Sequence, residues 1–102
     1  MKTDEKIYLV REWGRSKGII GSDGKATEQS QLAKLMEEVQ ELQDAIETND
    51  QPEKVDAIGD CTVVLILLAD IIGVPFEDCL DSAYDVIKGR TGKMVDGTFV
   101  KD

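Results

Sequence analysis

Residues 37–60 read EEVQELQDAIETNDQPEKVDAIGD, and this stretch decides the fold of the chain. It opens inside a helical pattern with the acidic run Glu37–Glu41. It closes with Asp56 and Asp60, which stand at the start of the most apolar segment of the chain. Between them, Thr48–Asp50 end one helix, and a proline follows in the first turn of the next. The stretch therefore predicts two consecutive helices that each carry a cluster of carboxylates.

The two clusters are interpreted as the halves of one cation site. An ionised carboxylate that leaves water is costly unless it is paired or bound to a metal. Glu38 and Glu41 are three residues apart, so they are neighbours on one helix face and can share an ion. Oxygen ligands on rigid helices suit Mg²⁺ or Mn²⁺ better than zinc. We expect Glu38, Glu41 and Asp60 to bind the cation, with Asp56 as a candidate fourth ligand.

Each acidic residue also has a purely structural explanation. A Glu-rich helical run is commonly a solvated helix face. Asp56 would suit a first helical turn, where a negative charge interacts favourably with the helix dipole. Asp60 can be a buried carboxylate that pairs with Lys or Arg of a neighbouring element. Asp60 distinguishes best between a cation site and a solvated helix face, because a helical bundle without a cation site would place an apolar residue at that position.

The composition excludes several classes of function. The chain has 102 residues with 21 acidic against 12 basic residues, a net charge of −9. Such a chain has no general basic surface for nucleic acid, although it can bind a single nucleotide through a bridging divalent cation. Histidine is absent, which excludes Ser-His-Asp and Cys-His nucleophile systems and histidine-containing zinc sites.

The cysteines and the apolar run indicate the compartment. Cys61 and Cys79 do not form a CxxC pair, and both lie in apolar helical patterns, so we expect buried, reduced thiols. The run from Cys61 to Ala69 is far shorter than the roughly 20 residues that cross a bilayer. We expect a soluble, cytoplasmic protein with no membrane partner.

Helical spacing of apolar residues predicts an all-α fold of four helices in a single domain, residues 1–102. Thr3 and Thr27 are expected to be the N-caps of the first two helices. Gly18–Lys25, rich in glycine, predicts a loop that is either a connector or a cover over a substrate. The core stripe of the second helix is expected to comprise Leu32, Leu35, Val39, Leu42 and Ile46.

The third helix and the C-terminus predict association between chains. The third helix is apolar on nearly every side between Cys61 and Ala69, so it should be central, with more apolar surface than one chain covers. This predicts a homodimer or homotetramer. After the helical part, residues 3–91, Asp96-Gly97 between apolar dipeptides predicts a β-hairpin over residues 93–101. A lone hairpin is marginal, so it should pack on the bundle or on another subunit.

The acidic clusters resemble the signature of the MazG-like nucleotide pyrophosphohydrolases, which belong to the all-α NTP pyrophosphatase superfamily. That signature is EExxE on one helix and ExxD at the start of the next. Glu37, Glu38 and Glu41 match the first part, and the similarity runs from about Glu12 to the end, including KGI and IKGRTGKMVDGTFVKD. One position departs, because the ExxD spacing from Asp60 falls on Ala57. The number of ligands and of metal ions therefore stays open.

The resemblance implies a four-helix bundle with a C-terminal β-hairpin and a Mg²⁺-dependent hydrolase (Mn²⁺ as the alternative ion). Such an enzyme cleaves a (d)NTP to the (d)NMP and pyrophosphate. The implied roles are metal ligands at Glu38, Glu41, Asp60 and Asp56, and catalysis by Glu37 and Glu38, with Glu37 orienting water. Candidate substrate contacts are Lys34, Lys88, Arg90 and Lys93 for phosphate, and Trp13, Gln31 and Tyr84 for the base.

Less specific explanations exist for these residues and for the function. Lys34 can pair with Glu38 one turn away, the C-terminal cations can serve solubility, and Trp13 can be a core residue.

Two other functions are compatible with the sequence. One is a catalytically weak nucleotide-binding relative, in which Ala57 impairs metal binding. The other is a helical interaction protein whose acids are a solvated face.

Overall fold

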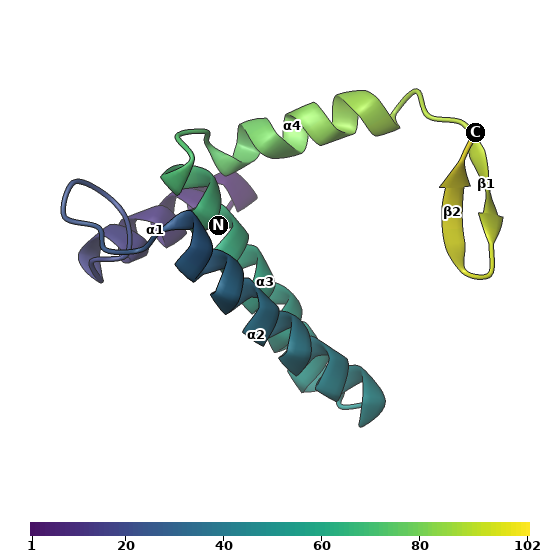
Figure 1. The fold of residues 1–102 in the computed structure, drawn as a ribbon, viewed down its shortest axis with the longest axis horizontal. Coiled ribbons are helices and arrows are strands. Elements are labelled where there is room, and N and C mark those ends of the chain that lie inside the picture. Colours follow the sequence, from purple (N-terminus) through teal and green to yellow (C-terminus); the bar gives the residue numbers. More distant parts are fainter.

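The computed structural model describes all 102 residues and contains four helices and one small antiparallel sheet. The elements in chain order are α1 (Thr3–Ser16), α2 (Glu28–Glu47), α3 (Gln51–Ile71), α4 (Phe76–Ile87), β1 (Gly92–Val95) and β2 (Thr98–Lys101). The predicted all-α class with a C-terminal hairpin is confirmed. The helices α2 and α3 lie side by side, α1 packs against α3, and α4 leads away from all three to the hairpin (Figure 1).

The helix boundaries follow from local hydrogen bonds. The hydroxyl of Thr27 accepts a hydrogen bond from the backbone N–H of Ser30 at 3.0 Å, and the Ser30 hydroxyl accepts one from the N–H of Thr27 at 2.9 Å. This reciprocal cap fixes the start of α2, as predicted. The prediction of Thr3 as an N-cap is wrong. Helix α1 begins at Thr3 itself, after Lys2, and no side chain caps it.

Helix α3 is central, as predicted, because it contacts each of the other three helices. Five of its residues are buried, namely Ala57, Val64, Ile66, Leu67 and Ala69. On the α1 side the approach is close at Gly14, where an added Cβ would lie 2.5 Å from Cδ2 of Leu67. Only glycine allows α1 and α3 to meet at this distance without moving a buried side chain.

The buried face of α2 differs from the predicted core stripe. Leu32, Val39 and Ile46 are exposed, and the two leucines between them are half-buried. The buried residues of α2 are instead Glu38 and Ala45. The packed face of α2 is rotated from the centre of the predicted stripe towards Glu38 and Ala45, and the helical period alone does not fix this rotation. The predicted stripe is therefore wrong for its three exposed residues and right in part for its two half-buried leucines.

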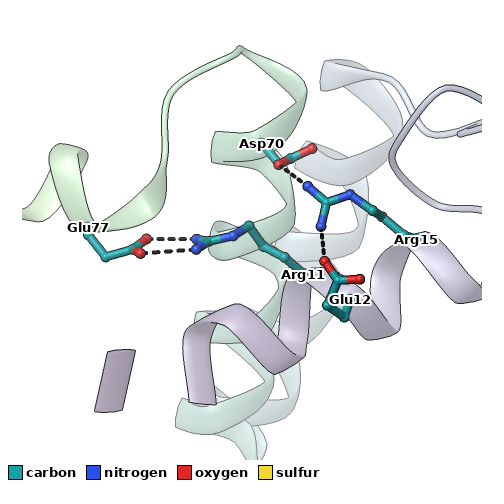
Figure 2. Close-up of polar contacts among 5 residues, drawn as sticks. All are labelled: Arg11, Glu12, Arg15, Asp70 and Glu77. Atoms are coloured by element: carbon teal, nitrogen blue, oxygen red, sulfur yellow. Dashed lines mark hydrogen bonds and ion pairs between the residues drawn. The ribbon is translucent and has the colours of Figure 1, made fainter. Parts of the chain in front are cut away.

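A sharp bend separates α3 from α4. The two helices meet at 102°, and Gly73 adopts a positive φ of 85° between them. Arg11 of α1 donates two hydrogen bonds to the carboxylate of Glu77 in the first turn of α4, at 2.7 and 3.0 Å (Figure 2).

Taken singly, none of the helices has the length and apolarity of a membrane span. The bent pair α3–α4 has both when its two helices are counted together, by length and composition alone.

The hairpin forms where Asp96-Gly97 predicts it. Strands β1 and β2 are antiparallel, with Met94 opposite Phe99. Asp96 and Gly97 have φ values of 50° and 84°, the pair of positive values that a tight primed turn requires. All hairpin residues are exposed, and no helix packs against the two strands. The hairpin is therefore not covered by the rest of this chain.

Candidate functional site

Three carboxylates from two helices meet on one side of the α2–α3 pair. Glu38 and Glu41 of α2 and Asp60 of α3 each contribute an oxygen, and these oxygens lie within 4.8 Å of one another. Neighbouring positions on α2 project Glu38 and Glu41 in the same direction, and the packing of α3 brings Asp60 to them. Glu38, Glu41 and Asp60 are called the acidic cluster below.

Glu38 is the buried member of the acidic cluster, with an exposed fraction of 7%. Its Oε1 lies 3.4 Å from the amine nitrogen of Lys34. Its Oε2 is buried and accepts no hydrogen bond. A buried carboxylate oxygen without a partner is costly and rare in folded proteins. A divalent cation, which prefers oxygen ligands, fits this position and the three carboxylates together.

The acidic cluster is crowded with negative charge. The neighbouring Glu38 carboxyl raises the pKa of Glu41. Burial raises the pKa of Asp60, and the charges of Asp56 and Glu38 raise it further. No arginine or lysine forms an ion pair with Asp60. Raised pKa values on adjacent carboxylates mean that their charged forms repel one another, so a bound cation would lower the free energy of the cluster.

Cys61 lies beside the acidic cluster. Burial raises the pKa of the Cys61 thiol, and the charges of Glu38, Asp60 and Glu41 raise it further. The thiol therefore stays protonated at neutral pH, which makes it a poor nucleophile. Its half-buried position differs slightly from the expected buried one.

An open cavity of about 590 Å³ adjoins Glu38 and Asp60. This volume lies within the range of roughly 300–1,000 Å³ that is usual for small-molecule sites. Six residues that the sequence analysis singled out line it: Trp13, Gln31, Lys34, Glu37, Glu38 and Asp60. They come from α1, α2 and α3. Trp13 is 47% exposed, so core packing does not account for it.

Lys34 is the cation closest to the acidic cluster. Its amine nitrogen lies 3.4 Å from a carboxylate oxygen of Glu37 and 3.4 Å from one of Glu38. The hydrogen bonds to Glu37 and then to Glu38 raise the pKa of Lys34, which stays charged at neutral pH. The ion pair with Glu38 that the helical spacing predicts is present. Lys34 also faces the cavity, where its charge is available to an anion.

Other predicted site residues lie elsewhere. Asp56 is exposed and lines a second cavity, of about 530 Å³, between α1 and α3. It is not part of the acidic cluster, so the geometry does not support it as a fourth ligand. Ala57, at the position where the ExxD pattern has an acid, is buried with an exposed fraction of 4%. The side chain that would complete that pattern is therefore missing from the packed face of α3.

The remaining candidates lie towards the C-terminus, away from the acidic cluster. Tyr84 is exposed on α4. Lys88 and Arg90 follow between α4 and β1, and Lys93 lies in β1. None of them lines either of the two large cavities. Within this one copy, the structure does not bring them to the cavity that Lys34 lines.

The apolar wall of the cavity was not singled out from the sequence. It comprises Ile19, Ala33, Val63, Val64 and Leu67. Ile19 comes from the predicted loop, which is held in place because Ile20 is buried and the N–H of Ile19 donates to the carbonyl of Gly14 at 2.9 Å. The sequence does contain a signal for this part of the wall, namely the two adjacent isoleucines Ile19 and Ile20 in the glycine-rich loop. The loop contributes to the cavity and is more than a connector.

Two comparisons relate the chain to known proteins. Residues 26–95 match the MazG nucleotide pyrophosphohydrolase domain. Over 63 residues, 62% of this chain, the sequence is 35% identical to an uncharacterized 18.2 kDa protein from the rep-hol intergenic region of Haemophilus phage HP1 (strain HP1c1). The match spans 37% of the length of that relative. No solved structure matches the chain.

Proposed function

Because the chain belongs to the MazG nucleotide pyrophosphohydrolase domain family, we propose that it hydrolyses a nucleoside triphosphate to the monophosphate and pyrophosphate with Mg²⁺ or Mn²⁺. The observation that carries this proposal is the buried Oε2 of Glu38. It has no hydrogen-bond partner, although it lies in one cluster with the carboxylates of Glu41 and Asp60. An oxygen in this position is stabilised best by a cation.

The proposed chemistry divides between the cation and the chain. When bound, Mg²⁺ supplies positive charge that offsets the charge of the triphosphate and polarises its phosphorus–oxygen bonds. Glu38 is the rigid ligand, because its buried side chain has little rotational freedom. Glu41 and Asp60 lie close enough to complete the carboxylate set. Mutual repulsion within this set is what the cation would relieve.

Glu37 is the proposed base. It lines the cavity and has an exposed side chain, so it can contact water as well as substrate. In the proposed reaction a water oxygen forms a bond to phosphorus, the α–β anhydride bond breaks, and pyrophosphate leaves. Glu37 orients the water and accepts its proton. Lys34, 3.4 Å from Glu37, would then hold the departing phosphate charge.

The cavity also suggests how the nucleoside is bound. Trp13 presents an aromatic surface on which a base can stack, an interaction worth roughly 1–3 kcal/mol. Gln31 offers an amide that both donates and accepts hydrogen bonds. Ile19 and Leu67 exclude water on the apolar side. A stacked base on this wall would leave the phosphates near Lys34 and the acidic cluster.

A second candidate function is a nucleotide-binding protein with weak turnover. One observation favours it, namely the buried Ala57 at the position of an expected carboxylate. Three protein ligands would leave the cation more weakly bound than four. Substrate binding without hydrolysis would then be the activity of the site.

Pyrophosphate release distinguishes these functions. A panel of canonical and modified (d)NTPs is assayed with Mg²⁺, with Mn²⁺ and with a chelator. The hydrolase is expected to release pyrophosphate only with a metal, and the weak relative is expected to be thermally stabilised by metal and nucleotide without release. If no nucleotide in the panel is either bound or cleaved, both functions are excluded.

A further inference from the structure

Three cavities meet at Asp60. The first cavity is the one of about 590 Å³ beside Glu38, and the second cavity is the one of about 530 Å³ between α1 and α3. A third cavity, of about 340 Å³, shares lining residues with each of them. Asp60 and Val63 line all three. The three cavities together are called the groove below, and the groove extends from α2 past Asp60 to the N-terminal part of α1.

Helix α1 lines the groove over two helical turns. Trp13 lines the first and third cavities, and Lys6 lines the second and third. These two residues are seven positions apart, which is about two turns, so they lie on one face of α1. Val10 lies between them and lines the second and third cavities. A ligand in the first cavity can therefore continue along this face of α1 into the second cavity.

The groove has a cation on each side of Asp60. Lys34 lines the first cavity, and Lys6 lines the second and third. Lys6 is exposed and forms no ion pair, so its amine is free to bind an anion. A chain of phosphates that passes Asp60 can contact both lysines, and their charge complements its own.

The second cavity is suited to a nucleoside rather than to phosphate. Its volume is in the range that is usual for small-molecule sites, and Ile7, Val55 and Ile66 provide apolar surface for a base. Asp56 lines the same cavity and is exposed. Its carboxylate repels phosphate, whereas a carboxylate accepts hydrogen bonds from the hydroxyl groups of a ribose. This assigns a contact to Asp56, which lies outside the acidic cluster.

We propose that the groove binds a phosphoanhydride with a nucleoside at each end, a dinucleoside polyphosphate. The proposal rests on the proposed function, because the acidic cluster and the base site beside Trp13 are the same. One nucleoside occupies the first cavity, and the phosphate chain passes Asp60 between Lys34 and Lys6. The second nucleoside occupies the second cavity, with its ribose beside Asp56. A nucleoside triphosphate would leave the second cavity empty.

The reaction is hydrolysis of one anhydride bond. A water oxygen forms a bond to the phosphorus that carries the nucleoside of the first cavity, and the bond from that phosphorus to the bridging oxygen breaks. The bridging oxygen leaves with the electron pair as part of the other product, and Glu37 accepts the proton of the water. A dinucleoside tetraphosphate is thereby converted to a nucleoside monophosphate and a nucleoside triphosphate. Contacts with the second nucleoside are remote from the breaking bond and can still raise kcat/KM.

A comparison of substrates tests the proposal. Symmetric dinucleoside tetraphosphates of adenine, guanine, cytosine and uracil are compared with the triphosphates of the same bases. The dinucleotide of the preferred base should have a kcat/KM at least about 10-fold above that of its triphosphate. In heavy-oxygen water, phosphorus NMR should find the label in the monophosphate product and not in the triphosphate product.

A variant that fills the second cavity tests the placement of the second nucleoside. Gly59 lines this cavity, and an added Cβ there meets nothing within 4 Å. Gly59→Leu should keep the helix, since leucine favours it more than glycine does, and should lower the ratio of the two kcat/KM values by about 10-fold. Gly89→Leu is the matched control, because an added Cβ also meets nothing within 4 Å and Gly89 lines none of the three cavities. It should keep the wild-type ratio.

A binding measurement without turnover tests Lys6. Trp13 is the only tryptophan of the chain, so its fluorescence reports occupancy of the first cavity. A dinucleoside tetraphosphate with methylene groups in place of the bridging oxygens is titrated in the presence of Mg²⁺. Lys6→Ala should raise its Kd by about 10-fold. Lys2→Ala should leave the Kd unchanged, because Lys2 is exposed, forms no ion pair and lines none of the three cavities.

The outcomes separate this inference from the proposed function. If the triphosphate is cleaved and no dinucleotide has a higher kcat/KM, or if Gly59→Leu keeps the wild-type ratio, the second nucleoside site is wrong and the proposed function stands. If dinucleotides are cleaved and triphosphates are not, the groove is supported and the proposed function is wrong. If neither class is bound or cleaved, both are wrong.

Discussion

The helices α1–α3 and the C-terminal arm, residues 80–102, differ in whether their apolar side chains are buried. Every buried residue of the protein lies between Gly14 and Ala69, and none lies in the arm. The arm carries large apolar side chains, among them Tyr84, Met94 and Phe99, yet all of its residues are exposed. The comparison teaches that helices α1–α3 and the loop between α1 and α2 are sufficient to assemble the acidic cluster and its cavity, whereas no other part of this copy covers the arm.

The largest expected effect concerns the helices that hold the site. Asp60→Asn should lower the rate of pyrophosphate release by at least about 100-fold, because it removes a charged ligand from the proposed metal centre. The melting temperature should stay the same or rise, since burial and neighbouring charges already disfavour the ionised form of Asp60. Activity and thermal melts are measured together.

Asp23→Asn is the control for that substitution, because Asp23 is exposed in the loop outside both cavities. It should keep full activity. Full activity in Asp60→Asn itself would show that the ligand assignment is wrong.

Metal should stabilise the same region. If the acidic cluster binds Mg²⁺ in the folded state alone, an ion concentration of 100 times Kd raises the free energy of unfolding by about 2.7 kcal/mol. Differential scanning calorimetry at fixed ionic strength measures this shift. Glu38→Gln should abolish it, and Arg90→Ala should leave it unchanged because the arm does not touch the cluster of its own chain. A wild-type melt that is insensitive to Mg²⁺ and Mn²⁺ would contradict a metal centre.

Packing should be critical in the helices and not in the arm. Gly14→Val places new atoms against Leu67, which is 2% exposed and has no room to move, so we expect a loss of about 1–3 kcal/mol in the free energy of unfolding. Gly89→Val is the matched change in the arm, where an added Cβ meets nothing within 4 Å. Urea titrations of the two variants should differ by most of that amount. Equal losses would contradict the contrast between the two regions.

The smallest expected effect concerns the ion pair that connects α1 to the first turn of α4. Arg11→Met should cost roughly 1–2 kcal/mol, since the pair with Glu77 is charged but only partly buried. The pair lowers the pKa of Glu77. Its stabilisation is therefore complete above the ordinary carboxyl pKa of 4.5 and is lost as the pH falls through the lowered value.

The difference in stability between wild type and Arg11→Met should thus be constant near neutral pH and shrink in acid. Denaturant titrations between neutral pH and pH values below 4.5 measure it. Arg15→Met provides the comparison, because the Arg15 side chain is 42% exposed and should contribute less. If the stability difference between wild type and Arg11→Met grew in acid, the stabilising partner of Arg11 would not be the Glu77 carboxylate.

Much of the fold is readable from the sequence because it depends on local chemistry. Thr27 caps α2, and the α2–α3 break falls where Thr48–Asp50 predict it. The Asp96-Gly97 turn fixes the hairpin, since its φ values suit these residues. The acids of the cluster were also identified, because carboxylates at helical spacing beside an apolar run are conspicuous. The cavity was predicted only in part, since its apolar wall has no distinctive residue types.

The sequence could not determine which apolar helix faces are buried within one chain. Helix α2 has one apolar stripe, and the helical period does not say which edge of it packs within the chain, where Leu35 and Leu42 are half-buried and Val39 stays exposed. The same period applies to α4, whose apolar stripe predicts a packed helix but stays exposed in this copy. A pattern of apolar residues says that a face will be covered, and it does not say by which element or by which chain.

The sequence by itself determined the number of helices, the hairpin turn and the identity of the carboxylates, because capping, turn geometry and spacing act over a few residues. Tertiary structure decided that Glu38 is buried without a partner for one oxygen, that Asp56 lies outside the acidic cluster, and that the arm points away from it. These features depend on the rotation of α2 against α3 and on the bend before α4. Both are set by packing between residues far apart in the chain, which no local pattern encodes.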